Sequence, residues 1–224
     1  MYASNDVHYL TCGASALNVI VSAVEIAGAL PASILDFGSG AGRVTRWLRA
    51  AYPKAGIWVT DIREDDLAFC KRTLGAKPFL SGTNVGVLAS PSSFDLIWVG
   101  SVVTHLSEDA SEALTRKLAS WLNPGGLLIM SMHGRFALAR APKFDYYAIT
   151  SGWDKLMEGL VSRGFGYADY PNQVGYGISM NTLAWASRLV EGIDGARLIL
   201  LSERAWDGHH DVVALQMRSV TKGL

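Results

Sequence analysis

The sequence predicts an α/β fold in which seven strands form one doubly wound sheet, five of them parallel, with helices on both faces. Short β-rich apolar runs alternate with helix-like patterns five times before residue 133. Because a strand–helix–strand unit returns through a right-handed crossover, these five strands are expected to lie parallel. Two further strand-like runs near the C-terminus are joined by the tight connection "WDGHH", which predicts an antiparallel hairpin.

Each expected element follows from local spacing and from the Gly and Pro residues that end it. The expected strands cover residues 33–37, 56–61, 77–80, 94–100 and 126–132, with the hairpin within 196–218. The expected helices cover residues 13–30, 44–51, 67–74, 107–122 and 181–190. Residues 133–179 break the alternation and are rich in Gly, Tyr, Trp and Pro. We expect one domain over residues 1–224, with residues 133–179 as an aromatic-rich insertion.

Composition narrows the function classes. Half of the 224 residues are apolar and 18% are charged, as in a compact globular protein. The formal net charge is zero and no long basic block occurs, so nucleic-acid binding is not expected. Cys12 and Cys70 stand far apart, which fits a reducing compartment. The apolar stretch 14–30 is interrupted by polar residues and no signal peptide is recognised, so we expect a cytoplasmic protein without a membrane span.

The glycine-rich stretch "ILDFGSGAGRVTRWL", residues 34–48, predicts a loop in which backbone approaches a nucleotide-like ligand. A phosphate-binding P-loop needs Lys followed by Ser or Thr, whereas Arg43 and Val44 stand there. A dinucleotide fingerprint places its third glycine one position later than Gly42, where this chain has Arg43. A nicotinamide dehydrogenase is therefore the less favoured alternative.

Two acidic residues near the glycine loop indicate which chemical groups the ligand carries. Asp36 precedes the glycines, a poor position beside a pyrophosphate but a good one beside an amino group or a sulfonium. Asp61 ends the second strand, where a carboxylate accepts hydrogen bonds from ribose hydroxyls. Its alternative role is to cap the following helix. Arg43 has two open roles, neutralising Asp36 or binding a carboxylate of the ligand.

These motifs resemble those of the class I S-adenosylmethionine-dependent methyltransferases. "ILDFGSGAGRVTRWL" resembles the motif I loop of that superfamily, and "WVTDI" resembles its ribose-binding acid. "FDLIWVGSVVTHL" is similar to its fourth strand and the segment that follows, and "LNPGGLLIMS" to the entry of its fifth strand. The resemblance extends from about Gly13 to Arg218, and it implies a Rossmann-like fold with S-adenosylmethionine as cofactor and S-adenosylhomocysteine as product.

The resemblance also implies a set of cofactor-binding residues. Asp36 would lie near the amino group of the methionine moiety, Asp61 would hold the ribose, and Ile62 would contact the adenine. The expected cofactor-binding residues are Asp36, Gly38, Ser39, Gly40, Gly42, Asp61, Ile62, Asn84, Val85, Gly100 and Ser101. Tyr9 is expected either to cover this site or to be an ordinary core tyrosine.

Two histidines are candidates for catalysis. His105 lies just beyond the fourth strand, where an imidazole could act as general base or merely orient its loop. His133 follows the fifth strand and is the second candidate. No metal is expected, because no acidic cluster occurs and adjacent side chains such as His209 and His210 point to opposite faces of a strand.

The acceptor is expected to be a small molecule. The ending "RAWDGHHDVVALQM" resembles "W…HQDV…L" of a subgroup associated with sugar, glycan or natural-product modification, with His210 in place of Gln. Inserted aromatics could form a lid over the acceptor, a small satellite core or a homodimer surface. The expected substrate-binding residues are Arg135, Tyr146, Tyr147, Tyr176, Trp206 and His209. We therefore expect methyl transfer to a hydroxyl group. The alternatives are a protein or RNA methyltransferase and a non-catalytic S-adenosylmethionine-binding partner subunit.

Overall fold

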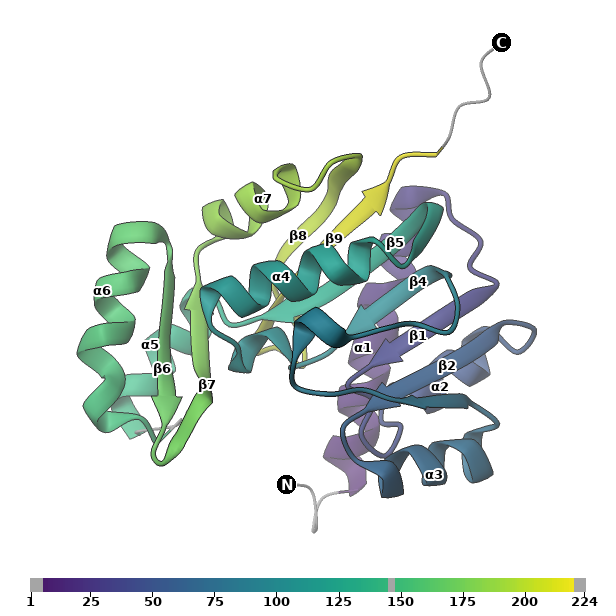
Figure 1. The fold of residues 1–224 in the computed structure, drawn as a ribbon, viewed down its shortest axis with the longest axis horizontal. Helices are drawn as coiled ribbons and strands as arrows, with labels where there is room; N and C mark the ends of the chain where they lie inside the picture. Colours follow the sequence, from purple (N-terminus) through teal and green to yellow (C-terminus); the bar gives the residue numbers. More distant parts are fainter. Residues whose placement is uncertain (1–5, 145–147, 220–224) are drawn as a thin grey trace.

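The computed structural model describes residues 6–144 and 148–219, and a seven-stranded sheet forms its centre (Figure 1). The sheet has the order β3-β2-β1-β4-β5-β9-β8. Its strands are β1 (Ser33–Phe37), β2 (Gly56–Asp61), β3 (Lys77–Leu80), β4 (Phe94–Val99), β5 (Leu122–Met132), β8 (Ala196–Trp206) and β9 (His210–Met217). Strands β1 to β5 pair in parallel, and β9 runs antiparallel between β5 and β8. The predicted sheet, with its terminal hairpin, is confirmed.

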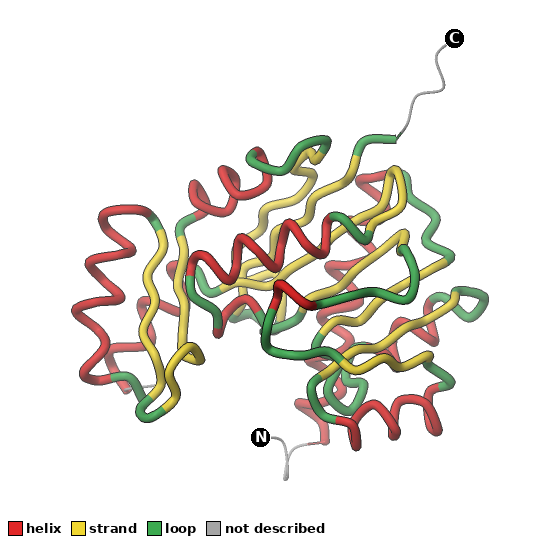
Figure 2. Tube along the Cα trace, in the orientation of Figure 1, coloured by secondary structure: helices red, strands yellow, loops and turns green. Residues whose placement is uncertain are grey.

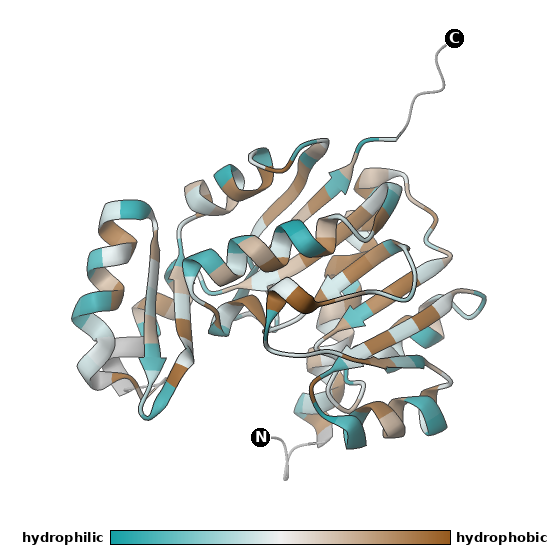
Figure 3. Ribbon diagram, in the orientation of Figure 1, coloured by the Kyte–Doolittle hydropathy of each residue, from teal (hydrophilic) through white to brown (hydrophobic). Residues whose placement is uncertain are grey.

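Helices cover both faces of this sheet. The helices are α1 (Asp6–Ala27), α2 (Thr45–Ala51), α3 (Glu64–Leu74), α4 (Glu108–Ala119), α5 (Arg135–Phe144), α6 (Trp153–Arg163) and α7 (Leu183–Glu191). Buried residues of α1, α2 and α3 share one core cluster, while α4 and α7 contribute to the cluster on the opposite face. Figure 3 shows the apolar strands between these two layers. The alternating apolar residues of the strands thus form two cores.

The order of the strands reverses beside β1, because β2 and β4 lie on its two sides. The chain leaves β1 toward β2 and later enters β4 on the other flank, so the loops at their carboxyl ends diverge. In open α/β sheets ligands bind in the crevice at such a switch point. The glycine loop follows β1 directly and lies at this position.

Helix α1 starts seven residues before the predicted boundary and ends three residues earlier, at Ala27 instead of residue 30. Gly13 is inside the helix, where an added Cβ would collide with the Arg43 carbonyl and the Trp47 side chain. Gly28 ends it with a positive φ of +61°. The helix is apolar and long enough to span a membrane, with a mean hydropathy of 1.6, but Ala16, Ile20 and Ala23 are fully buried in the sheet core.

The segment 133–179, predicted to be irregular, contains regular structure. Helices α5 and α6 precede a two-stranded antiparallel sheet of β6 (Phe165–Tyr170) and β7 (Gln173–Asn181). Figure 2 shows this group beside the main sheet. Ile149, Leu156, Ala168, Ile178 and Met180 form its own small core. The prediction missed these strands because Gly166, Gly175 and Gly177 interrupt the apolar alternation. Three short 3₁₀ segments complete the described chain: η1 (Val85–Val87), η2 (Val103–His105) and η3 (Thr150–Gly152).

Candidate functional site

The glycine loop begins where β1 ends, and its conformation requires glycine. Gly38, Gly40 and Gly42 have φ values of +73°, +49° and +77°. An added Cβ on Gly38 would collide with Val102, and one on Gly42 would contact Leu74 and Cys70. The amides of Gly38 and Ser39 donate hydrogen bonds to the carbonyl of Thr60. The loop is therefore fixed against the end of β2 while its backbone stays close to the switch point.

The carboxylate of Asp61, at the end of β2, organises the same loop. Its Oδ2 accepts a hydrogen bond from the Gly40 amide at 2.8 Å, and its Oδ1 accepts one from the Arg63 amide at 3.1 Å. Arg63 is the N-cap residue of α3, and no side-chain cap hydrogen bond forms at this helix, so Asp61 does not cap it. Each carboxylate oxygen retains a second lone pair, so the group can still accept hydrogen bonds from a ligand.

A first cavity of about 610 Å³ opens in front of Asp61. Phe37, Gly38, Gly100 and Ser101 line it together with the apolar side chains of Ile62, Val85 and Leu88. Ser101 has a positive φ of +58°, and its amide donates to Ser131 Oγ at 2.8 Å. Of the predicted cofactor-binding residues, the cavity brings together Gly38, Asp61, Ile62, Val85, Gly100 and Ser101.

Asp36 and Asn84 each accept a hydrogen bond from within the chain. The Asp36 carboxylate is 2% exposed beneath the loop, where it accepts a hydrogen bond from Thr45 Oγ1 at 2.6 Å. Burial raises the pKa of Asp36 to about 6, partly offset by Thr45 and Arg43. Asn84 is the N-cap of η1 and accepts from the Gly86 amide. Neither residue is among those that line the first cavity.

Five other residues in or beside the glycine loop lie outside the set that lines the first cavity. Ser39 is buried, and Gly40 and Gly42 shape the turn. The Arg43 guanidinium lies over the ring of Trp206, 5.2 Å from its centroid. The Tyr9 hydroxyl donates to the Ala41 carbonyl at 3.0 Å, so α1 is attached to the outer edge of the loop.

A second, wider cavity of about 990 Å³ adjoins the first one. The two cavities share three lining residues, Ser101, His105 and Tyr176. His105, in η2, therefore lies at the junction. Its Nδ1 is 2.9 Å from the carbonyl oxygen of Gly177 and 3.2 Å from the Tyr170 hydroxyl, and its ring stacks on Tyr176 at 5.0 Å.

The hydrogen bonding of His105 defines its tautomer. A carbonyl oxygen only accepts, so Nδ1 carries the proton and Nε2 carries the lone pair. Burial lowers the pKa of His105, with the Gly177 carbonyl opposing. The imidazole is therefore neutral near pH 7 and able to take a proton through Nε2.

The second cavity also brings together three histidines, two of which, His209 and His210, we predicted to point to opposite faces of a strand. Ligand nitrogens of His133, His209 and His210 lie within 4.8 Å of one another. The prediction of opposite faces was wrong because His209 belongs to the turn between β8 and β9, where the alternation of strand side chains does not apply. His133 is 3% exposed and its Nδ1 lies 3.2 Å from the Ser179 carbonyl.

The predicted substrate residues separate into different environments. Tyr176 and His209 line the second cavity. Trp206 is a core residue instead: it is 1% exposed, packs edge-on against Trp98 and donates Nε1–H to the Cys12 carbonyl. Tyr146 and Tyr147 lie outside the described residues.

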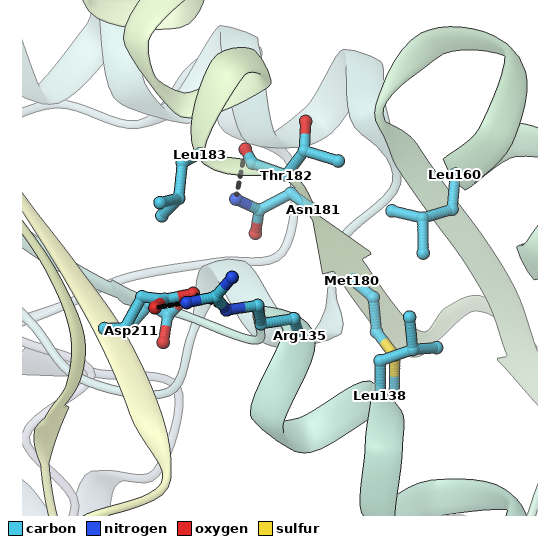
Figure 4. A pocket seen from close by; sticks show the side chains of 10 residues that line it. Arg135, Leu138, Leu160, Met180, Asn181, Thr182, Leu183 and Asp211 are labelled. Atoms are coloured by element: carbon cyan, nitrogen blue, oxygen red, sulfur yellow. Dashed lines mark hydrogen bonds and ion pairs between the residues drawn. The ribbon is translucent and has the colours of Figure 1, made fainter.

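Arg135 lies in a separate small cavity, shown in Figure 4. Its guanidinium pairs with Glu203 through two contacts of 2.5 Å, so the anion that it meets is a side chain of this protein. Asn181, whose amide donates to the Thr182 carbonyl, and Asp211 line the same cavity. Asp211 and His210 are neighbours on β9 yet line different cavities.

Several lining residues of the second cavity were not singled out by the sequence. They are His8, Arg140, Ala148, Pro171, Gln173 and Asp207. Tyr170 was noticed only as one of many inserted aromatics. The one available signal was the density of aromatic and histidine residues in the insertion and in "WDGHH". No local pattern indicates that α1, the β6–β7 hairpin and the β8–β9 turn meet.

Comparisons with known proteins agree with this arrangement. A family model described as a methyltransferase domain matches residues 35–128. The malonyl-[acyl-carrier protein] O-methyltransferase of Halalkalibacterium halodurans is 28% identical over 153 residues, which cover 58% of this chain and 55% of that protein. The N-terminal Xaa-Pro-Lys N-methyltransferase 1 of Rattus norvegicus is 30% identical over 102 residues, 43% of this chain and 45% of that protein. The chain thus spans about half the length of these curated relatives.

A solved structure extends the comparison to nearly the whole fold. The magnesium protoporphyrin IX methyltransferase of Synechocystis PCC 6803, with bound SAH, aligns with a TM-score of 0.61 and 18% identity. The alignment covers 97% of this chain and 91% of that one. The glycine loop, Asp61 and β4 all lie inside the segment matched by the methyltransferase domain. Residues 35–128 therefore match a methyltransferase domain, and the chain has the fold seen in the class I S-adenosylmethionine-dependent methyltransferase superfamily.

Proposed function

We propose that this chain transfers the methyl group of S-adenosylmethionine to a hydroxyl oxygen of a small-molecule acceptor, such as a sugar, a glycan precursor or a natural product. The observation that carries the proposal is the position of His105, at the junction of the two cavities with its basic Nε2 available. The first cavity would hold the cofactor and the second the acceptor.

S-adenosylmethionine is the cofactor of this superfamily, and the first cavity has features that fit it. Gly38 lines this cavity with a φ of +73°, so its backbone can lie along the methionine moiety. Asp61 retains lone pairs for ribose hydroxyls, and Ile62, Val85 and Leu88 offer apolar surface to an adenine. When bound, the cofactor supplies a methyl group made electrophilic by its sulfonium.

The chain's own residues would then position and deprotonate the acceptor. Tyr176 and Tyr170 present aromatic surface beside His105, which suits a sugar ring or a phenol better than a polyanion. His105 Nε2 would accept the hydroxyl proton, while the Gly177 carbonyl keeps Nδ1–H in place. The cavity volume of about 990 Å³ lies at the upper end of the usual range for small-molecule sites.

A second candidate function is methylation of a protein amine. It is favoured by the relative of 30% identity whose name describes an N-terminal Xaa-Pro-Lys N-methyltransferase. The formal net charge of zero gives no support to an RNA substrate. A non-catalytic S-adenosylmethionine-binding partner subunit is the remaining alternative.

The test is a methyl-transfer assay with labelled S-adenosylmethionine. Hydroxylated sugars and phenols form one arm, and peptides that begin Xaa-Pro-Lys form the other. We expect label on the hydroxylated arm and a rate at least about 100-fold lower in His105→Ala, the scale of general-base catalysis. Label on peptides alone would contradict the acceptor class. Cofactor binding without transfer to any acceptor would favour the partner-subunit alternative.

A further inference from the structure

We propose that His133, His209 and His210 form a binding site for a divalent transition metal of the zinc class, facing the second cavity. His133 follows β5, His209 belongs to the β8–β9 turn and His210 begins β9, so the site exists only in the folded chain. The proposal does not depend on which acceptor is methylated, because metal binding can be measured without methyl transfer.

The spacing of the three imidazoles suits one ion. Their ligand nitrogens lie within 4.8 Å of one another, so a central point is about 2.8 Å or less from each nitrogen. Zinc–nitrogen bonds are about 2.0–2.1 Å, so each nitrogen must approach by less than about 1 Å. The ring centroids are 4.7–5.5 Å apart, and the proposal requires the half-buried His209 to rotate in its turn toward the other two rings.

The surroundings of the ligands match those of metal-bound histidines. His133 Nδ1 faces the Ser179 carbonyl at 3.2 Å, which leaves the lone pair on Nε2. Metal-binding histidines commonly donate their other ring N–H to a backbone carbonyl in this way. His210 Nδ1 is buried and has no hydrogen-bond partner among the described residues. A bound ion would satisfy a polar group of this kind.

Protons do not compete with a metal ion for the three imidazoles near pH 7. Burial lowers the pKa of His133 well below its usual value, and the pKa of His210 falls to about 3 through burial, His209 and Arg43. Burial and Arg140 lower the pKa of His209, with Asp207 opposing. All three imidazoles are therefore neutral near pH 7, the form that binds metals.

The type of the ligands and the charges near them indicate which metal ion the site would bind. Three neutral imidazoles suit zinc and similar ions, whereas magnesium prefers oxygen ligands. Three protein ligands leave a fourth position for water or an acceptor oxygen, as in catalytic zinc sites. Arg43 and Arg140 are positive and Asp207 is negative, so removal of one arginine should strengthen binding of a cation.

The experiment is calorimetric titration of the full chain with Zn²⁺ and, separately, with Mg²⁺. Cobalt absorption serves as a second probe, because tetrahedral cobalt gives strong visible bands. We expect one Zn²⁺ per chain with micromolar or tighter affinity, and no response to Mg²⁺. Absence of Zn²⁺ binding, or equal binding of both ions, would overturn the site.

Substitutions test whether the Zn²⁺ ion binds at these three histidines. His209→Ala changes a half-buried turn residue and His210→Gln keeps a polar group, and each should weaken Zn²⁺ binding at least about tenfold. His8→Ala, an imidazole deletion in the same cavity, should leave it unchanged. Arg140→Gln should tighten Zn²⁺ binding about twofold or more. Unchanged affinity in both histidine variants, or weaker binding in Arg140→Gln, would refute the proposal.

Discussion

The imidazole of His105 combines three properties that a general base needs. It lines both cavities, its Nδ1–H is held by a carbonyl, and its pKa is lowered by burial. The lowered pKa keeps the base in its neutral form at physiological pH. Protonation of Nε2 would remove the lone pair that the proposed general base needs.

The pH dependence of the rate follows from this property. The neutral form is present above the folded-state pKa of His105, which lies below 6.5. We therefore predict a rate constant that is level near pH 7–8 and falls as the pH drops through a value below about 6.5. The acid limb should disappear from the residual activity of His105→Gln. If the His105→Gln variant keeps the same fall in rate at low pH, a group other than His105 causes that fall.

Asp36 gives a prediction about stability. Its pKa is raised from 3.8 to about 6, so the folded state binds the proton more tightly than the unfolded state. Its contribution to stability is full below about pH 4 and is lost as the pH rises through 6. Asp36→Asn should therefore raise the free energy of unfolding at pH 7.5 by about 1–3 kcal/mol and change little at pH 4. Denaturant unfolding at both pH values tests this, with the exposed Asp65→Asn as control.

At the level of elements, the glycine loop is the part most sensitive to substitution. Gly38 has a φ of +73° and Val102 fills the space of its missing Cβ. We predict that Gly38→Ala destabilises the fold by about 1–2 kcal/mol and weakens S-adenosylhomocysteine binding. Gly82→Ala is the matched control, because Gly82 lines the same cavity and an added Cβ would meet no atom within 4 Å. Equal effects in both variants would contradict the loop's role.

The β6–β7 hairpin carries a second prediction. Asp169 Oδ1 accepts hydrogen bonds from the Tyr167 hydroxyl at 2.7 Å and from the Gly175 amide at 2.9 Å. These bonds hold the hairpin tip, whose residues Val174 to Tyr176 line the first cavity. Asp169→Ala should weaken S-adenosylhomocysteine binding by about 1 kcal/mol, about fivefold. Asp169→Asn keeps a carbonyl acceptor and should bind more tightly than Asp169→Ala.

The elements differed in how well the sequence predicted them. β1 and β2 agree with prediction at both ends, because buried parallel strands are continuous apolar runs bounded by glycine or proline. α1 was predicted too short because Gly13 was taken as its start. β6 and β7 were missed because their small residues hide the alternation that identifies strands.

The whole molecule assembles its site from segments that are far apart in the chain. Motif residues at the ends of β1, β2 and β4 could be predicted, because parallel strands bring their carboxyl ends to one edge. The second cavity could not be predicted from the sequence, because it depends on how α1, the β6–β7 hairpin and the β8–β9 turn pack together. Trp206 was also predicted incorrectly from the sequence. Its motif suggested a substrate contact, but its ring fills the core beside Trp98.

The central claim is that the first cavity binds S-adenosylmethionine through Asp61, and calorimetry tests it most directly. We predict that S-adenosylhomocysteine binds the chain with one-to-one stoichiometry and that NADH does not bind. Asp61→Ala should weaken binding by about 1–3 kcal/mol, the scale of lost hydrogen bonds to a charged group, whereas the exposed Asp65→Ala should not. Binding of NADH without S-adenosylhomocysteine, or an affinity that is the same in Asp61→Ala as in the wild type, would contradict the account.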